Sequence, residues 1–277
     1  MREMPEIDAI VGTGDFPRIV ETISQVLAGE RQVRVGKPVY QYSRDLPRVQ
    51  ATPGHTAYLK IAEGCNNACS YCVIPALRGP LRSRPIDDLV DEAASLAARR
   101  VKEIILIAQD TTAYGLDIYG EYRLAELLRS LCRIEDLRWI RVLYSYPTRF
   151  TDDLIDVISR EDKICKYLDI PLQYGSDEIL KQMNREGDRS QALNLIRRLK
   201  ESIPDIVLRT SLIVGFPGET EAHFEELLDF IRQIQFDHAG VFTYSQEEGT
   251  PAGTRADQVP EEVKQERFRR AMEVQQE

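Results

Sequence analysis

The sequence predicts a parallel α/β fold in the form of an incomplete (β/α)6 TIM-type barrel. From residue 58 onward, an apolar segment is followed by a helical pattern six times. The apolar segments are almost uninterrupted, as in Ile104-Ile105-Leu106-Ile107, which is typical of parallel strands covered on both faces. Six strand–helix units of this kind form either an incomplete barrel or a doubly wound sheet.

The residues that follow the strands favour the barrel. Barrel active sites are assembled from the carboxyl ends of several strands at once. Here each strand runs into a polar, glycine-rich or aromatic segment, and these segments are Glu63-Gly64-Cys65, Gln109-Asp110-Thr111, Tyr144-Ser145-Tyr146, Pro171-Leu172-Gln173, Gly215-Phe216-Pro217-Gly218 and Tyr244-Ser245-Gln246.

The elements follow from the apolar pattern and from helix start signals. The expected strands cover residues 58–61, 103–108, 139–143, 167–170, 206–214 and 239–243. The expected helices cover residues 86–100, 124–133, 152–159, 177–183, 191–202 and 221–234. Side chains that can cap their free backbone amides are Asp87 or Asp88, Thr151, Ser176, Ser190 and Thr220. A seventh, charged helix over 261–276 is expected to trail off the end of the barrel.

The chain divides into four predicted parts. A strand over 7–11 and a helix over 16–27 cannot bury their own faces, so residues 1–28 are expected to be a remnant βα unit of a missing N-terminal domain. Residues 29–57 mix prolines, glycines and arginines without helical periodicity and are expected to form a linker. The partial barrel spans 58–250, and residues 251–277 are expected to form a C-terminal helix that leads to an absent domain.

Charge and composition limit the partners. The chain of 277 residues carries a formal net charge of −9, which disfavours a chain-wide nucleic-acid footprint and suits a basic protein partner. No apolar run approaches the roughly 18 residues of a membrane span, and the first residues lack the pattern of a secretory signal. The five cysteines do not resemble a disulfide framework, so a cytoplasmic location is expected.

Three of the five cysteines lie in one short loop, as Cys65, Cys69 and Cys72 with the spacing C-x3-C-x2-C. Three thiolates are one ligand short of a closed zinc site, which usually takes a fourth Cys or His at short spacing. Structural zinc is the alternative, although His55 lies across a strand from the loop. A four-iron cluster on three thiolates, with its fourth iron open to a small ligand, fits the loop better.

The motif formed by Cys65, Cys69, Tyr71 and Cys72 resembles the radical S-adenosylmethionine (SAM) superfamily. The resemblance implies a [4Fe-4S] cluster on the three cysteines, whose open iron binds the amino and carboxylate groups of SAM. It also implies that one electron, supplied by an electron donor, cleaves SAM to methionine and a 5′-deoxyadenosyl radical. The protein would orient these groups and exclude side reactions.

Longer segments resemble the methylthiotransferase branch of that superfamily, namely 58–65, 74–80, 82–85 and 213–220. Within the branch, 108–115 and 144–148 are similar to the ribosomal-protein enzymes, the RimO family. The transfer-RNA enzymes usually carry a Gln-Asn-Val-type sequence where Gln109-Asp110-Thr111 stands. The resemblance implies transfer of a methylthio group to the β-carbon of an aspartate in a basic ribosomal protein of the small subunit. A transfer-RNA adenosine methylthiotransferase is the enzyme alternative, and a structural zinc or iron–sulfur module is the non-enzyme alternative.

The resemblance also implies a part that this chain lacks. The family carries a second iron–sulfur cluster on three further cysteines of an N-terminal domain, where sulfur is delivered, and this chain has no cysteine before Cys65. We therefore expect a core fragment that binds and cleaves SAM without completing methylthiolation by itself.

The resemblance and the strand ends together give the expected cofactor contacts, which are Tyr71, Gln109, Gln173, Arg209 and Gly215. The tyrosine is expected near the adenine, the next three near the ribose or carboxylate, and the glycine beside the adenosine. Each has an ordinary alternative, because packing, barrel hydrogen bonds and a tight turn use the same residue types. Cys132 and Cys165 fit small apolar packing positions. No catalytic acid or base is assigned.

Overall fold

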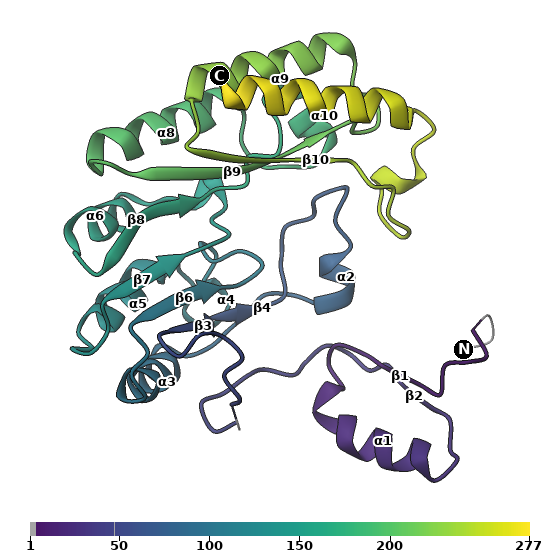
Figure 1. The fold of residues 1–277 in the computed structure, drawn as a ribbon, viewed down its shortest axis with the longest axis vertical. Coiled ribbons are helices and arrows are strands. Elements are labelled where there is room, and N and C mark those ends of the chain that lie inside the picture. Colours follow the sequence, from purple (N-terminus) through teal and green to yellow (C-terminus); the bar gives the residue numbers. More distant parts are fainter. Residues whose placement is uncertain (1–3, 47) are drawn as a thin grey trace.

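The computed structural model describes residues 4–46 and 48–277 and places six parallel strands in one sheet (Figure 1). In sheet order these are β10 (His238–Thr243), β9 (Val207–Val214), β8 (Ile164–Asp169), β7 (Trp139–Val142), β6 (Glu103–Ile107) and β3 (Thr56–Lys60). Because every neighbouring pair is parallel, the carboxyl ends of all six strands lie along one edge. The order follows the chain and leaves β3 and β10 at opposite ends of the sheet, which confirms the predicted incomplete (β/α)6 barrel.

All seven helices predicted after residue 58 are present. They are α3 (Ile86–Ala98), α5 (Leu124–Cys132), α6 (Asp152–Arg160), α7 (Asp177–Gln182), α8 (Arg189–Ser202), α9 (Glu221–Ile234) and α10 (Glu261–Gln276). Two short helices, α2 (Ile74–Arg78) and α4 (Leu116–Tyr119), go beyond the prediction. Their five and four residues are too few to display a helical period.

Two of the predicted helix caps are confirmed. Thr151 accepts a hydrogen bond from the backbone of α6, and Thr220 accepts one from the backbone of α9. The predicted cap at Ser190 is wrong, because α8 begins earlier and the carboxylate of Asp188 caps it. Ser176 precedes α7 without a side-chain cap bond among the described residues.

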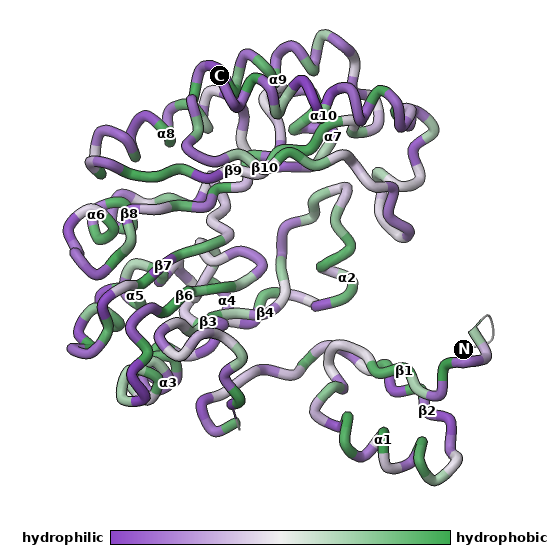
Figure 2. The backbone as a smooth tube through the Cα atoms, viewed as in Figure 1, coloured by the Kyte–Doolittle hydropathy of each residue, from purple (hydrophilic) through white to green (hydrophobic). Residues whose placement is uncertain are grey.

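Only one face of the sheet is fully buried. Along β6, Ile104 and Leu106 are fully buried, whereas Ile105 and Ile107 alternate with them and are only partly buried. The expectation of two covered faces is therefore wrong. Helices cover the outer face, while the inner face of an incomplete barrel stays partly open. Figure 2 shows the hydrophobic run along β6 and the largely hydrophilic character of α10.

The charged helix α10 does not trail away from the barrel but packs on α9 and β10 (Figure 1). Two buried basic side chains of α10 attach the helix to the barrel. Lys264 donates to the carbonyl of Tyr244 at 2.9 Å, and Arg267 pairs with Glu219 at 2.9 Å. These contacts attach the helix to the strand end after β10 and to the turn before α9.

The N-terminal residues form a small unit of their own, which lies beside α2 in Figure 1. Strand β1 (Ala9–Val11) pairs in parallel with β2 (Gln32–Arg34), and helix α1 (Ile19–Leu27) connects them. The strand β2 lies inside the segment predicted as a linker, 29–57. The domain boundaries remain a prediction, and residues 1–3 and 47 of these segments lie outside the described part. No helix within the described ranges is both long and apolar enough to cross a membrane.

Candidate active site

The cysteine loop leaves the sheet edge after β3 and is closed at its base by two short antiparallel strands, β4 (Ala62–Glu63) and β5 (Arg82–Ser83). Gly64 opens the loop with φ +78°, and a Cβ atom there would lie 2.1 Å from the carbonyl oxygen of Pro80. The Cys65 amide donates to the Gly79 carbonyl at 3.1 Å, which holds the first cysteine at this base. Glycine is therefore required by both the backbone angle and the available space.

The far end of the loop is anchored on other elements. The Ser70 amide donates to the Met183 carbonyl at 2.8 Å, and the Ser70 hydroxyl donates to the Gln182 carbonyl at 2.8 Å. The Ser70 carbonyl in turn accepts from the Ala252 amide at 2.8 Å. Residues far away in the sequence thus hold the segment between the second and third cysteines.

Cys65, Cys69 and Cys72 line one cavity of about 510 Å³ at the carboxyl ends of the strands. The thiol of Cys69 is buried and the other two are partly buried. Burial raises the pKa of the Cys65 and Cys72 thiols above the usual range. Among the described residues, no three Cys, His, Asp or Glu side chains converge closely enough to hold a single metal ion. A four-iron cluster makes no such demand, since each thiolate binds a different iron.

Two buried polar atoms in this cavity fit a polar ligand. The side-chain oxygens of Gln109 and Ser145 are buried and lack a hydrogen-bond partner among the described residues. The amide nitrogen of Gln109 donates to Glu63 at 3.3 Å, which fixes the orientation of the free oxygen. A buried acceptor or hydroxyl without a partner costs free energy of folding. A bound ligand with hydrogen-bonding groups would give partners to the oxygens of Gln109 and Ser145.

Backbone strain marks the same cavity. Tyr144 and Gln173 follow β7 and β8, line the cavity, and adopt φ +60° and φ +72°. Left-handed conformations of residues other than glycine are uncommon and cluster at functional sites. Tyr71 and Gln173 also line a neighbouring cavity of about 540 Å³ that reaches Phe242 on β10. Three of the five predicted cofactor contacts, Tyr71, Gln109 and Gln173, are thus brought together with the cysteines.

The other two predicted contacts lie outside the lining of the cysteine cavity. Arg209 is on β9 and pairs with Asp169 at 2.6 Å. Gly215 has φ +74°, and a Cβ atom there would lie 2.3 Å from the side chain of Lys264. The absence of a side chain at Gly215 therefore allows the Lys264 side chain of α10 to pack against it. Cys132 and Cys165 are also outside this lining, as predicted for packing positions.

Arg185, which no pattern in the sequence singles out, lies at the centre of the site. Its guanidinium donates to the Tyr71 hydroxyl at 3.2 Å and to the Pro171 carbonyl at 2.7 Å, and it lies 3.9 Å from the Cys69 sulfur. It also stacks over the ring of Tyr146 at 4.4 Å. A cation in this position favours negative charge at the cysteines. The residue stands in a turn after α7, where no local pattern distinguishes it from a surface arginine.

Known proteins resemble this chain over nearly its whole length. The model of the family described as the radical SAM superfamily matches residues 59–231. The uS12 ribosomal-protein methylthiotransferase RimO of Heliobacterium modesticaldum is 54% identical over 275 residues, which cover 99% of this chain and 60% of that protein. The enzyme of the same name from Symbiobacterium thermophilum is 56% identical over 276 residues, covering 100% of this chain and 57% of that protein. The chain thus spans about 60% of the length of these relatives.

Solved structures show the same fold at low sequence identity. The radical SAM methyltransferase TsrM from Kitasatospora setae aligns with a TM-score of 0.66 at 20% identity, covering 88% of this chain and 52% of that chain. Coproporphyrinogen III oxidase (HemN) from Escherichia coli aligns with a TM-score of 0.59 at 18% identity, covering 84% of this chain and 56% of that chain. With the family match over most of the barrel and the resemblance to RimO confirmed, the chain belongs to the radical SAM superfamily.

Proposed function

We propose that Cys65, Cys69 and Cys72 hold a [4Fe-4S] cluster whose open iron binds SAM, and that the chain cleaves SAM reductively. The observation that carries this proposal is the convergence of three thiols and two unsatisfied buried polar atoms, on Gln109 and Ser145, in one cavity at the strand ends. When bound, the cluster and SAM supply hydrogen abstraction through one-electron cleavage of the sulfonium bond.

The chain's own residues bind and orient these groups. The free oxygen of Gln109 and the hydroxyl of Ser145 are available to the polar groups of SAM. Tyr71 is proposed to pack against the adenine, since it lines both this cavity and the neighbouring one. Arg185 partly offsets the negative charge that three thiolates bring into the site, and its stacking on Tyr146 keeps it in place. Gln173 lies where the two cavities meet.

The proposed substrate is the β-carbon of an aspartate in a small-subunit ribosomal protein, which receives a methylthio group. The relatives are named uS12 ribosomal-protein methylthiotransferases, and a net charge of −9 suits a basic ribosomal protein. Because the chain spans about 60% of these relatives, the complete reaction is proposed for a longer protein. That protein would carry the second iron–sulfur cluster, receive electrons from a donor and act in the cytoplasm.

Anaerobic reconstitution with iron and sulfide tests the core of the proposal. We expect a brown protein that, with dithionite and SAM, releases 5′-deoxyadenosine and methionine. Replacement of Cys65, Cys69 or Cys72 by alanine should reduce 5′-deoxyadenosine to the background of the protein-free mixture. The matched control is Cys132→Ala, which removes a thiol outside the cavity lining and should keep both cluster and product.

A colourless protein that holds stoichiometric zinc would contradict the proposal and favour the structural module. The substrate is tested separately. The full-length enzyme, assayed on a uS12-type protein and on transfer RNA, should methylthiolate only the protein, and modification of the RNA would favour the alternative.

A further inference from the structure

The side chain of Asn67, between the first two cysteines of the loop, is held from two sides. Its amide nitrogen donates to the Asp110 carboxylate at 3.0 Å, and its oxygen accepts from the Arg149 guanidinium at 2.7 Å. Its backbone amide donates to the Cys65 sulfur at 3.4 Å. One residue thus links the sulfur of the first cysteine to two charged groups that follow β6 and β7.

The two charged groups pair with each other in a nearly closed setting. Asp110 and Arg149 form an ion pair, and their side chains are only 3% and 13% exposed. The second oxygen of Asp110 accepts from the Thr112 hydroxyl at 2.7 Å and from the Ala113 amide at 3.2 Å. Both carboxylate oxygens are therefore occupied by the protein, so Asp110 is a poor candidate for a base or a ligand.

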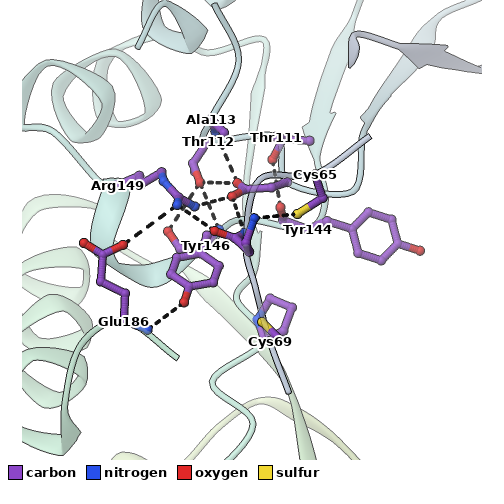
Figure 3. Close-up of polar contacts among 12 residues, drawn as sticks. Cys65, Cys69, Thr111, Thr112, Ala113, Tyr144, Tyr146, Arg149 and Glu186 are labelled. Atoms are coloured by element: carbon purple, nitrogen blue, oxygen red, sulfur yellow. Dashed lines mark hydrogen bonds and ion pairs between the residues drawn. The ribbon is translucent and has the colours of Figure 1, made fainter. Parts of the chain in front are cut away.

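The arginine is fixed as firmly as the aspartate. Its guanidinium stacks over the ring of Tyr146 at 4.5 Å, on the strand end after β7 (Figure 3). Glu186, which lies 3.8 Å from the guanidinium, is 68% exposed and is screened by solvent. The buried pair of Asp110 and Arg149 is neutral in itself and places no net charge beside Cys65. It holds the loop in register with two strand ends, while each of its members alone would be a nearby charge in a medium of low polarity.

The hydrogen bond to the Cys65 sulfur and the Asp110–Arg149 ion pair would both influence an iron–sulfur cluster held by the loop. Its reduction potential depends on hydrogen bonds to the ligand sulfurs and on net charge nearby. The hydrogen bond from the Asn67 backbone amide to the Cys65 sulfur would stabilise the reduced, more negative cluster. An uncompensated Asp110 would disfavour that state, and an uncompensated Arg149 would favour it.

We infer that Asn67, Asp110 and Arg149 form a positioning network that holds the Asn67 backbone amide in its hydrogen bond to the Cys65 sulfur and, through charge balance, sets the reduction potential of the cluster. The inference rests on the proposed function, since it requires a cluster on the three cysteines. It assigns to the Asp110–Arg149 pair a task beyond stability, namely to keep the cluster environment neutral at this side of the loop.

The test is a redox titration of the full reconstituted chain, followed by visible absorption and by electron paramagnetic resonance of the reduced cluster. Asp110→Asn leaves a lone cation and should raise the potential, changing the ratio of reduced to oxidised cluster at a fixed potential by about tenfold, or about 59 mV for one electron. Arg149→Gln leaves a lone carboxylate and should lower the potential by a similar factor. The double variant should return close to the wild-type value.

A purely structural pair would not move the potential in opposite directions and restore it in the double variant. The matched control is Arg129→Gln, which breaks an exposed ion pair with Asp153 and should leave the potential unchanged. Potentials that shift in the same direction, or not at all, in cluster-bearing variants would overturn the inference. A wild-type chain that takes up no cluster would instead overturn the proposed function itself.

Should a charge variant fail to fold, Asn67→Ala still tests the positioning role of the network. It removes both side-chain bonds of the network without changing any charge. We expect a lower cluster yield and a broadened resonance signal, because the loop is no longer held against the two strand ends. An unchanged signal and an unchanged potential in this variant would overturn the positioning role.

Discussion

At the scale of single residues, the cysteine loop depends on a glycine as much as on its thiols. Gly64 has φ +78°, and the backbone oxygens of Gly79 and Pro80 lie where a Cβ atom would stand. Gly120 has the same φ of +78°, but no described atom lies within 4 Å of its virtual Cβ. The two glycines therefore separate the cost of the backbone angle from the cost of the steric clash.

Both glycines are to be replaced by alanine. Gly120→Ala should cost about 1–2 kcal/mol of unfolding free energy, the price of a left-handed conformation, and should keep the cluster. Gly64→Ala should cost more, because the chain must also shift at the base of the loop, and its cluster content should fall. Urea unfolding and iron analysis check this pair. Equal stability losses with equal cluster content would contradict the steric argument.

The residues of the site divide into those that local sequence can reveal and those that it cannot. The cysteines carry a distinctive spacing, and Gln109 and Gln173 stand in the segments that follow predicted strands, so the sequence points to all of them. Arg185 lines the cavity from a turn, and Arg149 pairs with the cavity residue Asp110 from the short 3-10 helix Pro147–Arg149. Both arginines have ordinary neighbours in the sequence. Their importance comes from distances to atoms that are far away in the chain, and no periodicity reports such distances.

At the scale of elements, α10 shows how a charged helix can become part of the fold. Arg267 is 7% exposed and pairs with Glu219, which is fully buried. Glu219 also accepts from the Gly215 amide at 2.7 Å and from the Phe216 amide at 3.2 Å. Burial raises the pKa of the Glu219 carboxyl, and Arg267 opposes that rise. The helix was predicted to trail away because buried ion pairs look like surface charges in a sequence.

Arg267→Met should destabilise the chain by about 3–5 kcal/mol, because it leaves a buried carboxylate without its cation. The pKa of Glu219 should then rise further. A carboxyl with a raised folded pKa loses its contribution to stability as the pH increases through that pKa, so the destabilisation should be smaller at acidic pH and grow as the pH rises above the ordinary carboxyl range. Urea unfolding at several pH values measures this.

The control for this prediction lies on the same helix. Arg270 pairs with Glu221 at 2.6 Å, and both side chains are exposed to solvent at 33% and 59%. Arg270→Met should cost about 1 kcal/mol or less, with little dependence on pH. A loss as large as that of Arg267→Met would show that helix packing, rather than the buried charge, explains the effect.

At the scale of the whole molecule, the incomplete barrel leaves its inner face accessible. The single tryptophan of the chain, Trp139, begins β7 and is 54% exposed. Its neighbour Ile140 is fully buried, and since side chains alternate along a strand, Trp139 lies on the face away from the outer helices. It is thus a natural probe of the inner face, at the end of the sheet opposite the cysteines.

We expect iodide to quench the fluorescence of Trp139 with a constant near half that of the urea-unfolded chain, in line with its exposed fraction. Addition of SAM should leave this constant unchanged, since the cofactor cavity lies at the carboxyl ends of the strands. Weak quenching in the folded chain would contradict an open inner face and indicate that another part or a second copy covers it.

The sequence by itself determined the strand–helix order, the partial barrel, the cysteine site and the family, because these depend on local periodicity and on short spacings. Only the tertiary structure decided that α10 packs on the barrel, that one sheet face stays open, and that Arg209 and Gly215 stand apart from the cavity. It also brought Asn67, Asp110 and Arg149 together beside Cys65. Such contacts join residues that are remote in the chain, and their energies depend on burial and distance, which become defined only when the chain folds.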